Sequence, residues 1–137
     1  MSFFKVDVFT PAGTVDKNID ATSVVIPTVR GEITVLPEHT HLITELAPGI
    51  LTVKGGAHGD RHFFLSVGIA KILKNKITIL AHTSEKAQSI DKERAERALN
   101  KAKAKLSGKD LLTDLELIKY RRKLERAEYR MKLAYLR

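Results

Sequence analysis

The chain has 137 residues, of which 43% are hydrophobic and none is cysteine, and it carries 24 Lys and Arg against 16 Asp and Glu. This length and composition fit one packed core with an appendage and argue against wholesale disorder. The absence of cysteine excludes disulfides, thiolate metal ligands and a cysteine nucleophile. The first residues lack the features of a signal peptide, and no apolar run of about 18 residues predicts a membrane-spanning helix.

Residues 3–81 have the pattern of short β-strands. Phe4, Val6 and Val8 alternate with less apolar residues, which is the period of a half-buried strand. The segment 10–13 has the proline and glycine of a type I turn, and Lys74-Asn75 predicts a hairpin turn. Further β-rich runs cover 23–26, 32–36, 41–45, 50–53, 63–67, 70–73 and 77–80. Many short strands without a helical period predict an antiparallel sandwich or barrel.

From Ser89 onward the pattern is helical, with no proline before Leu136 and Gly108 as the one glycine. Ser89 is the predicted N-cap of a first helix, with Asp91 in its first turn. Gly108 is expected to end this helix, and Thr113 with Glu116 forms a capping box that begins a second one. The expected apolar stripe is Ile90, Ala95, Ala98, Leu99, Ala102 and Leu106 on the first helix. On the second helix it is Leu115, Ile118, Leu124, Ala127, Met131 and Ala134.

The prediction is therefore an α+β protein, with an N-terminal antiparallel β-sandwich or barrel at 1–86 and a two-helix antiparallel hairpin at 87–137. The hinge is expected within 82–89. Because the stripes would bury little surface, we expect the hairpin to dock on its own sandwich or on another subunit.

Charge is concentrated in the helical part. Residues 1–86 hold 9 of the 24 basic and 8 of the 16 acidic residues, whereas 87–137 hold 15 and 8, a net charge of +7. A basic segment of this kind fits an anionic partner, although a solvated helical face explains the charge equally well.

Four segments resemble the epsilon subunit of bacterial F-type ATP synthases, and together they cover the chain. They are Val6 to Gly13, Gly31 to His39 with Leu42 and Pro48-Gly49, Phe64 to Ile72 leading into Ile77 to Ala81, and Ile90 to Ala95. The last is similar to the isoleucine-aspartate-x-x-arginine-alanine pattern tied to ATP binding in some family members. Thr34, Glu38 and Val67 stand where the family often has glycine, which puts local loop shape in doubt.

The resemblance implies a non-catalytic rotor subunit that couples the catalytic head to the membrane ring during proton-driven synthesis of ATP from ADP and phosphate. Its partners would be the gamma subunit, the c-ring and, when the hairpin extends, the catalytic alpha and beta subunits. It would lie peripherally, at the cytoplasmic face of a bacterial membrane. The residues that match the interface with the ring and gamma are Gly31, Glu32, Leu36, Pro37, Glu38 and His39. An ordinary strand connection with polar ends is the alternative.

The resemblance also implies a regulatory ATP, with little or no need for Mg²⁺, and no required cofactor. Asp91 and Arg94 share one helical face, as do Arg126 and Arg130, and guanidinium groups suit phosphate oxygens. The matching positions are Glu85, Ile90, Asp91, Arg94, Ala95, Arg126 and Arg130. The sequence has no Walker-type loop, so the site would sense ATP without hydrolysing it. A plain surface ion pair is the alternative.

An extended hairpin would present its basic second helix to acidic segments of the beta subunits and block ATP hydrolysis. The basic residues concerned are Arg121, Arg122, Lys123, Arg126 and Arg130. Bound ATP would favour the folded state only by its higher affinity for it.

Other classes fit less well. His39 with His41, and His58 with His62, lack a convincing third ligand, so we expect no metal site. The basic helices also fit a nucleic-acid-binding module, but few aromatic residues accompany them. A stand-alone enzyme lacks a recognisable nucleophile or carboxylate pair, and a membrane-surface helix lacks Trp or Phe.

Overall fold

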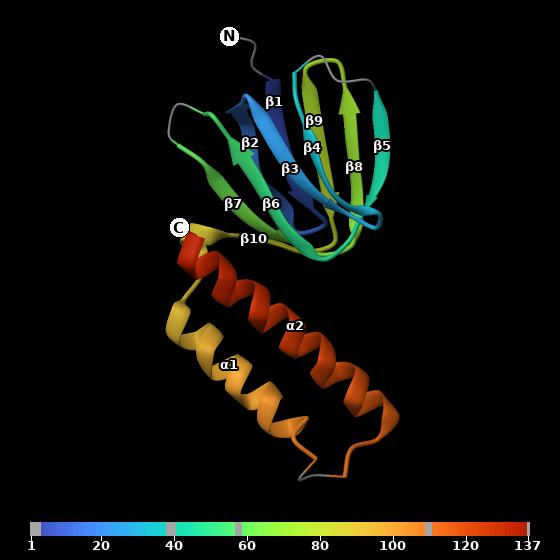
Figure 1. Ribbon diagram of the computed structural model, residues 1–137, viewed down its shortest axis with the longest axis vertical. Helices are drawn as coiled ribbons and strands as arrows, with labels where there is room; N and C mark the ends of the chain where they lie inside the picture. Colours follow the sequence, from blue (N-terminus) through green and yellow to red (C-terminus); the bar gives the residue numbers. More distant parts are fainter. Residues whose placement is uncertain (1–3, 38–40, 57–58, 109–110, 137) are drawn as a thin grey trace. The chain divides into compact units, whose positions relative to one another are not determined.

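The computed structural model describes residues 4–37, 41–56, 59–108 and 111–136. The chain divides into two compact units, Met1–Ala87 and Gln88–Arg137. The first is built of strands and the second of helices, as the ribbon shows (Figure 1). This confirms the predicted fold class. No helix in the described ranges is long and apolar enough to cross a membrane.

The first unit is a two-layer sandwich. Its strands are β1 (Phe4–Thr10), β2 (Gly13–Ala21), β3 (Ser23–Thr28), β4 (Gly31–Val35), β5 (Leu42–Leu46), β6 (Gly49–Lys54), β7 (Arg61–Leu65), β8 (Gly68–Leu73), β9 (Lys76–Ala81) and β10 (Ser84–Lys86). They follow the order β10-β7-β6-β3-β5-β8-β9-β1-β2, with β4 on the other side of β3. β3 pairs with β5 only through Thr28 and Leu46, so the sheet folds into two layers at this point (Figure 1).

All strand pairs recorded for the described residues are antiparallel, except that β1 runs parallel to β9, with Val6 opposite Ile77. Alternate residues of each strand point between the layers. Val6, Val8, Ile26 and Leu51 are fully shielded from solvent there. The core thus comes from the period-two pattern that predicted the strands.

Two strands were not predicted. β2 is rich in polar residues and contains bulges where its pairing with β1 shifts near Val8. Asn18 has a positive φ of 53° in this region, and its N–H donates to Oδ1 of Asp7 at 2.8 Å. β10 lies within the expected hinge and pairs with β7. The segment 84–86 is therefore part of the sheet and not a free linker.

The helical unit consists of α1 (Lys92–Lys105) and α2 (Asp114–Leu136), preceded by a 3₁₀ turn at Ala87–Ser89. The predicted N-cap at Ser89 is wrong. Asp91 caps α1, and its Oδ1 accepts from the N–H of Arg94 at 3.1 Å. The carboxylate of Asp91 therefore precedes the first turn instead of lying within it.

The predicted start of α2 is confirmed, whereas α1 ends at Lys105, three residues before Gly108. Thr113 Oγ1 accepts from the N–H of Glu116 at 3.2 Å, and Oε1 of Glu116 accepts from the N–H of Thr113 at 3.3 Å. Gly108 follows the C-cap residue Leu106 and has a φ of 87°.

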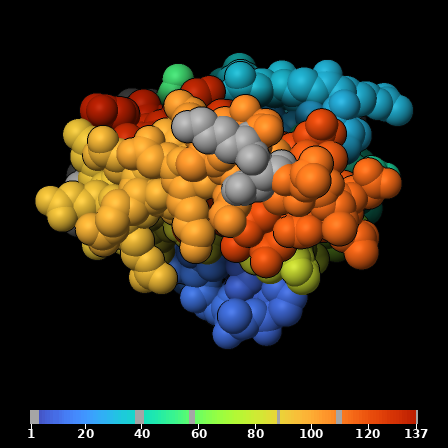
Figure 2. All heavy atoms as spheres, turned by 90° about the horizontal axis from the view of Figure 1, so that it is seen from below, coloured from blue at the N-terminus to red at the C-terminus, as the bar shows by residue number. Residues whose placement is uncertain are grey.

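α1 and α2 run in opposite directions in the ribbon (Figure 1), and their atoms lie next to one another in the space-filling view (Figure 2). Buried alanines occur on both helices, at 95 and 102 on α1 and at 127 and 134 on α2. The expected stripe of α2 is wrong at its start, because Leu115 and Ile118 are 80% and 48% exposed. Ile118 precedes Ala127 by two and a half turns at about 3.6 residues per turn, so the two residues lie on opposite sides of the helix.

Candidate functional site

The predicted interface segment 31–39 begins on β4, a strand that follows a tight turn. Thr28 is buried, and its hydroxyl donates to the carbonyl of Gly31 at 2.6 Å and accepts from the N–H of Arg30 at 3.2 Å. These bonds fix the entry to β4, where Gly31 has a φ of 106°. Glu32 and Leu36 are exposed beyond this turn.

The same segment combines polar and apolar groups at the surface. Leu36 is 57% exposed and Val29, before the turn, 58%. Pro37 is half-buried. Glu38 and His39 lie outside the described residues, so the predicted set is only partly placed. The described part offers both an apolar contact and a carboxylate.

A second exposed surface was not predicted. Ile69 on β8 lies opposite Leu80 on β9, and Leu80 in turn lies opposite Phe9 on β1. Ile69 and Leu80 are 46% and 50% exposed, and Val67 is 57% exposed. We call Phe9, Val67, Ile69 and Leu80 the apolar face. It borders a hollow of about 520 Å³ lined by Phe9, Thr10, Pro11, Val67, Gly68, Leu80, Ala81 and His82.

The apolar face was missed because the sequence does not show which strands become neighbours, although alternation along each strand indicates which residues point outward. Ile69 and Leu80 stand out of phase with the buried residues of their strands, Ala70, Ile72 and Ile79. Strict alternation would have placed them outward. Ile69, Leu80 and Phe9 are therefore neighbouring apolar residues on adjacent strands, and such a surface is a candidate for docking.

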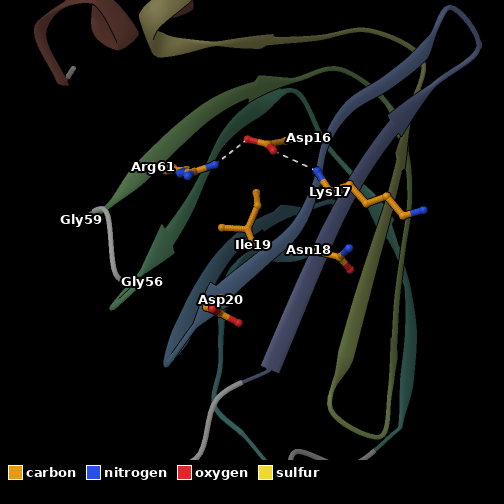
Figure 3. A pocket seen from close by; sticks show the side chains of 8 residues that line it. All are labelled: Asp16, Lys17, Asn18, Ile19, Asp20, Gly56, Gly59 and Arg61. Carbon is orange, nitrogen blue, oxygen red and sulfur yellow. Dashed lines mark hydrogen bonds and ion pairs between the residues drawn. The ribbon is translucent and has the colours of Figure 1, made fainter.

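A polar hollow of about 330 Å³ lies beside β2 and is lined by Asp16, Lys17, Asn18, Ile19, Asp20, Gly56, Gly59 and Arg61 (Figure 3). Nη1 of Arg61 lies 2.8 Å from Oδ2 of Asp16, and the two side chains face each other in the view. Nζ of Lys86 lies 3.5 Å from the same oxygen. One carboxylate therefore joins β2 to both β7 and β10.

The predicted nucleotide residues come from β10, from α1 and the two residues before it, and from α2. Glu85 is the middle residue of β10, opposite Phe64 on β7. Ile90 and Ala95 are buried. Asp91 and Arg94 meet through the cap hydrogen bond, which uses the backbone of Arg94 and leaves its guanidinium on the exposed side of α1.

The arginines of α2 complete that set. Arg126 is exposed and Arg130 half-buried. They lie about one turn apart on α2, as the sequence predicted. The convergence of this pair with Asp91 and Arg94 remains a prediction.

The predicted basic segment of α2 is displayed to solvent, with Arg121, Arg122 and Lys123 all exposed. The Tyr120 ring lies among ammonium groups, at 5.5 Å from Nζ of Lys123 and 5.9 Å from Nζ of Lys105 on α1. Nζ of Lys92 lies 4.4 Å from the Tyr135 ring, which links the other ends of the two helices. These cation–π contacts hold lysines without neutralising them.

The described residues include no cluster of three His, Cys, Asp or Glu side chains that could hold a metal. Of the four histidines considered, His62 shares a hydrogen bond of 3.1 Å with the hydroxyl of Thr52. His41 lies at an exposed position. His39 and His58 lie outside the described residues.

Comparison with known proteins gives independent evidence of the family to which the chain belongs. A family model described as "ATP synthase, Delta/Epsilon chain, beta-sandwich domain" matches residues 3–87. An ATP synthase epsilon chain of Staphylococcus aureus (strain JH9) is 34% identical over 137 residues, which is the full length of both chains. One from Desulfosudis oleivorans is 38% identical over 102 residues, covering 74% of this chain and 76% of its own.

Solved structures agree in fold. A chain in a cryo-EM structure of the Euglena gracilis mitochondrial ATP synthase, which includes OSCP, F1 and the c-ring, matches all of this chain and 83% of its own with a TM-score of 0.78 and 25% identity. A chain from the central stalk and c-ring of the Tetrahymena thermophila mitochondrial ATP synthase matches with a TM-score of 0.58 and 16% identity, covering 93% of each. The second match concerns the fold alone.

Proposed function

Because the chain belongs to the family of ATP synthase epsilon chains, non-catalytic subunits of the central stalk of the F-type enzyme, we propose that its sandwich couples the stalk to the c-ring and its helical hairpin restrains ATP hydrolysis. The net charge of +7 on residues 87–137, which both helices share and to which the exposed Arg121, Arg122 and Lys123 of α2 contribute, is the observation that carries the restraint. Rotation would then be linked to ATP synthesis driven by a proton gradient.

The sandwich has two surfaces for its partners. The apolar face suits burial against the gamma subunit, because exposed aliphatic side chains gain most from contact with another protein. Glu32 and Leu36, at the ends of β4, suit the polar loops of a c-ring, which require hydrogen bonds and charge as well as apolar contact. Both contacts would hold the chain at the cytoplasmic face of a bacterial membrane.

The helical hairpin is suited to change its position. Each helix has its own N-cap, so its N-terminal end needs no partner from the sandwich. The buried residues of the pair are mostly alanines, which bury little surface, so the two helices also separate from each other at little cost. In an extended position, Arg121, Arg122 and Lys123 would meet carboxylates of the catalytic beta subunits, with alpha subunits alongside.

The restraint is tested in the assembled enzyme. A chain that ends after Gln88 keeps all ten strands and should raise the rate of ATP hydrolysis, measured under conditions where the intact chain inhibits. Replacing Arg121, Arg122 and Lys123 together by alanine should reproduce much of the increase. Replacing Lys101, Lys103 and Lys105 on α1 is the matched control and should have a smaller effect. Equal hydrolysis with and without the hairpin would contradict the proposal.

We propose further that ATP favours the folded hairpin by binding to it alone. Arg126 and Arg130 would hold phosphate oxygens through forked N–H donors, and the resemblance implies Asp91, Arg94 and Glu85 as further positions. Asp91 already accepts one hydrogen bond from the helix and keeps its second carboxylate oxygen for a ligand.

This site is tested by titrating ATP into the isolated chain and measuring the heat of binding, with and without EDTA because a bound Mg²⁺ is not expected to be needed. The Arg126→Ala/Arg130→Ala variant should bind at least tenfold more weakly, since each lost charged hydrogen bond costs about 1.5–3 kcal/mol. Lys119→Ala/Lys123→Ala removes the same charge elsewhere on α2 and should bind normally. Equal affinity of the wild type and the double arginine variant would remove these residues from the site.

A further inference from the structure

The junction between the two units begins at β10, a strand of only three residues at one end of the sheet. It pairs with β7 on one side, with Ser84, Glu85 and Lys86 opposite Leu65, Phe64 and Phe63. A short edge strand with a single neighbour opens more easily than the strands inside the sheet. What holds β10 therefore decides where the sandwich ends.

Asp16 provides a second hold on β10. Its Oδ2 lies 2.8 Å from Nη1 of Arg61 on β7 and 3.5 Å from Nζ of Lys86, the last residue of β10. β2 and β10 stand at opposite ends of the strand order, so Asp16 bridges the two open edges of the sandwich (Figure 3 shows its contact with Arg61). Its side chain is only 15% exposed, which limits screening by salt.

The bulge in β2 positions Asp16 for this contact. Val8 pairs with Asp16 while Val6 pairs with Ile19, so β2 has one extra residue between these two pairs. Asn18 turns through a positive φ there, and its N–H is held by the buried carboxylate of Asp7. A bulge bends its strand and redirects the neighbouring side chains. Asp16 thus reaches the other edge of the sandwich because of the bulge in β2.

The junction also contains groups that favour opening. Thr83 Oγ1 and Ser84 Oγ are buried and have no hydrogen-bond partner among the described residues. A buried hydroxyl without a partner loses the hydrogen bonds that water would give it. Release of β10 would let water form hydrogen bonds with these hydroxyls, which favours opening. The ion pair between Asp16 and Lys86 opposes this opening.

We propose that Asp16 is a latch that holds β10, through Lys86, on the sandwich and thereby sets the length of the tether to the helical hairpin. This inference rests on the proposed mobility of the hairpin. With the latch closed, the tether begins after Lys86, at the 3₁₀ turn Ala87–Ser89. With the latch open, the three residues of β10 join it and add up to roughly 10 Å of reach, at about 3.3 Å per extended residue.

The latch is tested by amide hydrogen exchange, followed by NMR on the isolated full chain. Lys86→Met keeps the aliphatic stem and leaves the Asp16–Arg61 pair in place. It should speed exchange of the hydrogen-bonded amides of β10 by roughly fivefold, the effect of losing a partly shielded ion pair. Lys86→Arg should retain the slow exchange. Lys5→Met removes the exposed ion pair with Asp20, also on β2, and should leave β10 unchanged.

Two results would overturn the latch. One is exchange of β10 within twofold of the wild type in Lys86→Met. The other is an equal rise in β6 and β10, since β6 lies inside the sheet and would report a general loss of stability. Because the measurement uses the isolated chain, its outcome does not depend on ATP hydrolysis. Failure of the restraint is judged separately, by the chain that ends after Gln88.

Discussion

Asp7 is a charged side chain placed in the core, with only 1% of its surface exposed. Its Oδ1 accepts from Asn18, and its Oδ2 lies 3.2 Å from Nζ of Lys76. Burial alone raises the pKa of Asp7, but the hydrogen bond from Asn18 and the ammonium groups of Lys76 and Lys17 outweigh it and hold the pKa below its ordinary value of 3.8. The folded protein therefore stabilises the ionised form of Asp7.

Replacing Asp7 by Asn should lower the free energy of unfolding by about 1–3 kcal/mol at pH 7, because the ion pair to Lys76 is lost and the amide satisfies its neighbours less well. The lowered pKa means that the contribution of Asp7 is complete above pH 3.8 and is lost as the pH falls through the folded value. The wild type should thus lose stability in acid more steeply than Asp7→Asn.

Urea unfolding from pH 7 down to pH 2 measures both effects. Asp20→Asn serves as the control because Asp20 makes an exposed ion pair with Lys5. Parallel acid profiles for the wild type and Asp7→Asn would contradict the role assigned to Asp7.

Gly68 is required by a close approach of two strands. A Cβ at this position would lie 2.1 Å from the carbonyl oxygen of Leu80 and 2.8 Å from Cα of Ala81, both backbone atoms of β9. Gly68→Ala should separate β8 from β9 locally and lower the midpoint of thermal unfolding by several degrees or more. Val67→Ala, at the exposed neighbouring position, should change the midpoint little. Normal stability of Gly68→Ala would show that the strands can separate without cost.

At the scale of elements, the two helices depend on their caps. Thr113→Ala removes the hydroxyl that accepts from Glu116 and should destabilise α2 by about 1 kcal/mol. Thr113→Ser keeps the hydroxyl and should behave like the wild type. Circular dichroism at 222 nm during heating measures the loss of helix. Equal helix content in the alanine and serine variants at all temperatures would mean that the packed helices need no cap.

The sequence predicted elements well where burial repeats with a regular period. β1, β6, β8 and β9 have alternating apolar residues, and the capping box marks the start of α2. β2 was not predicted because its bulges break the alternation and its polar residues resemble those of a loop. β10 was not predicted because three residues are too few to show the alternation of a strand, and its position depends on β7 and Asp16.

The candidate sites were predictable to a smaller extent. The resemblance indicated the positions Glu32, Asp91 and Arg126. That Asp91 and not Ser89 caps α1 depends on local backbone geometry, because either side chain is able to form a cap. The apolar face depends on which strands become neighbours, Ile69 with Leu80 and Leu80 with Phe9. Such pairings between distant segments are settled by tertiary packing and not by local sequence.

At the scale of the whole molecule, we expect the apolar face to govern assembly. Leu80→Ser should weaken binding of the chain to the rest of the stalk by roughly three- to tenfold, since Leu80 is 50% exposed and burial of the remaining half of a leucine contributes about 0.8–1.5 kcal/mol. Leu73→Ser is the matched control, because Leu73 lies at an exposed position of β8 and does not line the hollow. Surface plasmon resonance on the stalk complex measures both, and equal affinities would place the docking surface elsewhere.

The parallel pairing of β1 with β9 also has a consequence for synthesis on the ribosome. Val6 and Ile77 meet across about 70 intervening positions, so the first strand must wait for the ninth before it gains its second neighbour. Until β9 emerges, β1 can form only its hairpin with β2, and its buried face remains uncovered. The sandwich should therefore close late in translation and in one step, while the helices, whose contacts are local, form soon after they emerge.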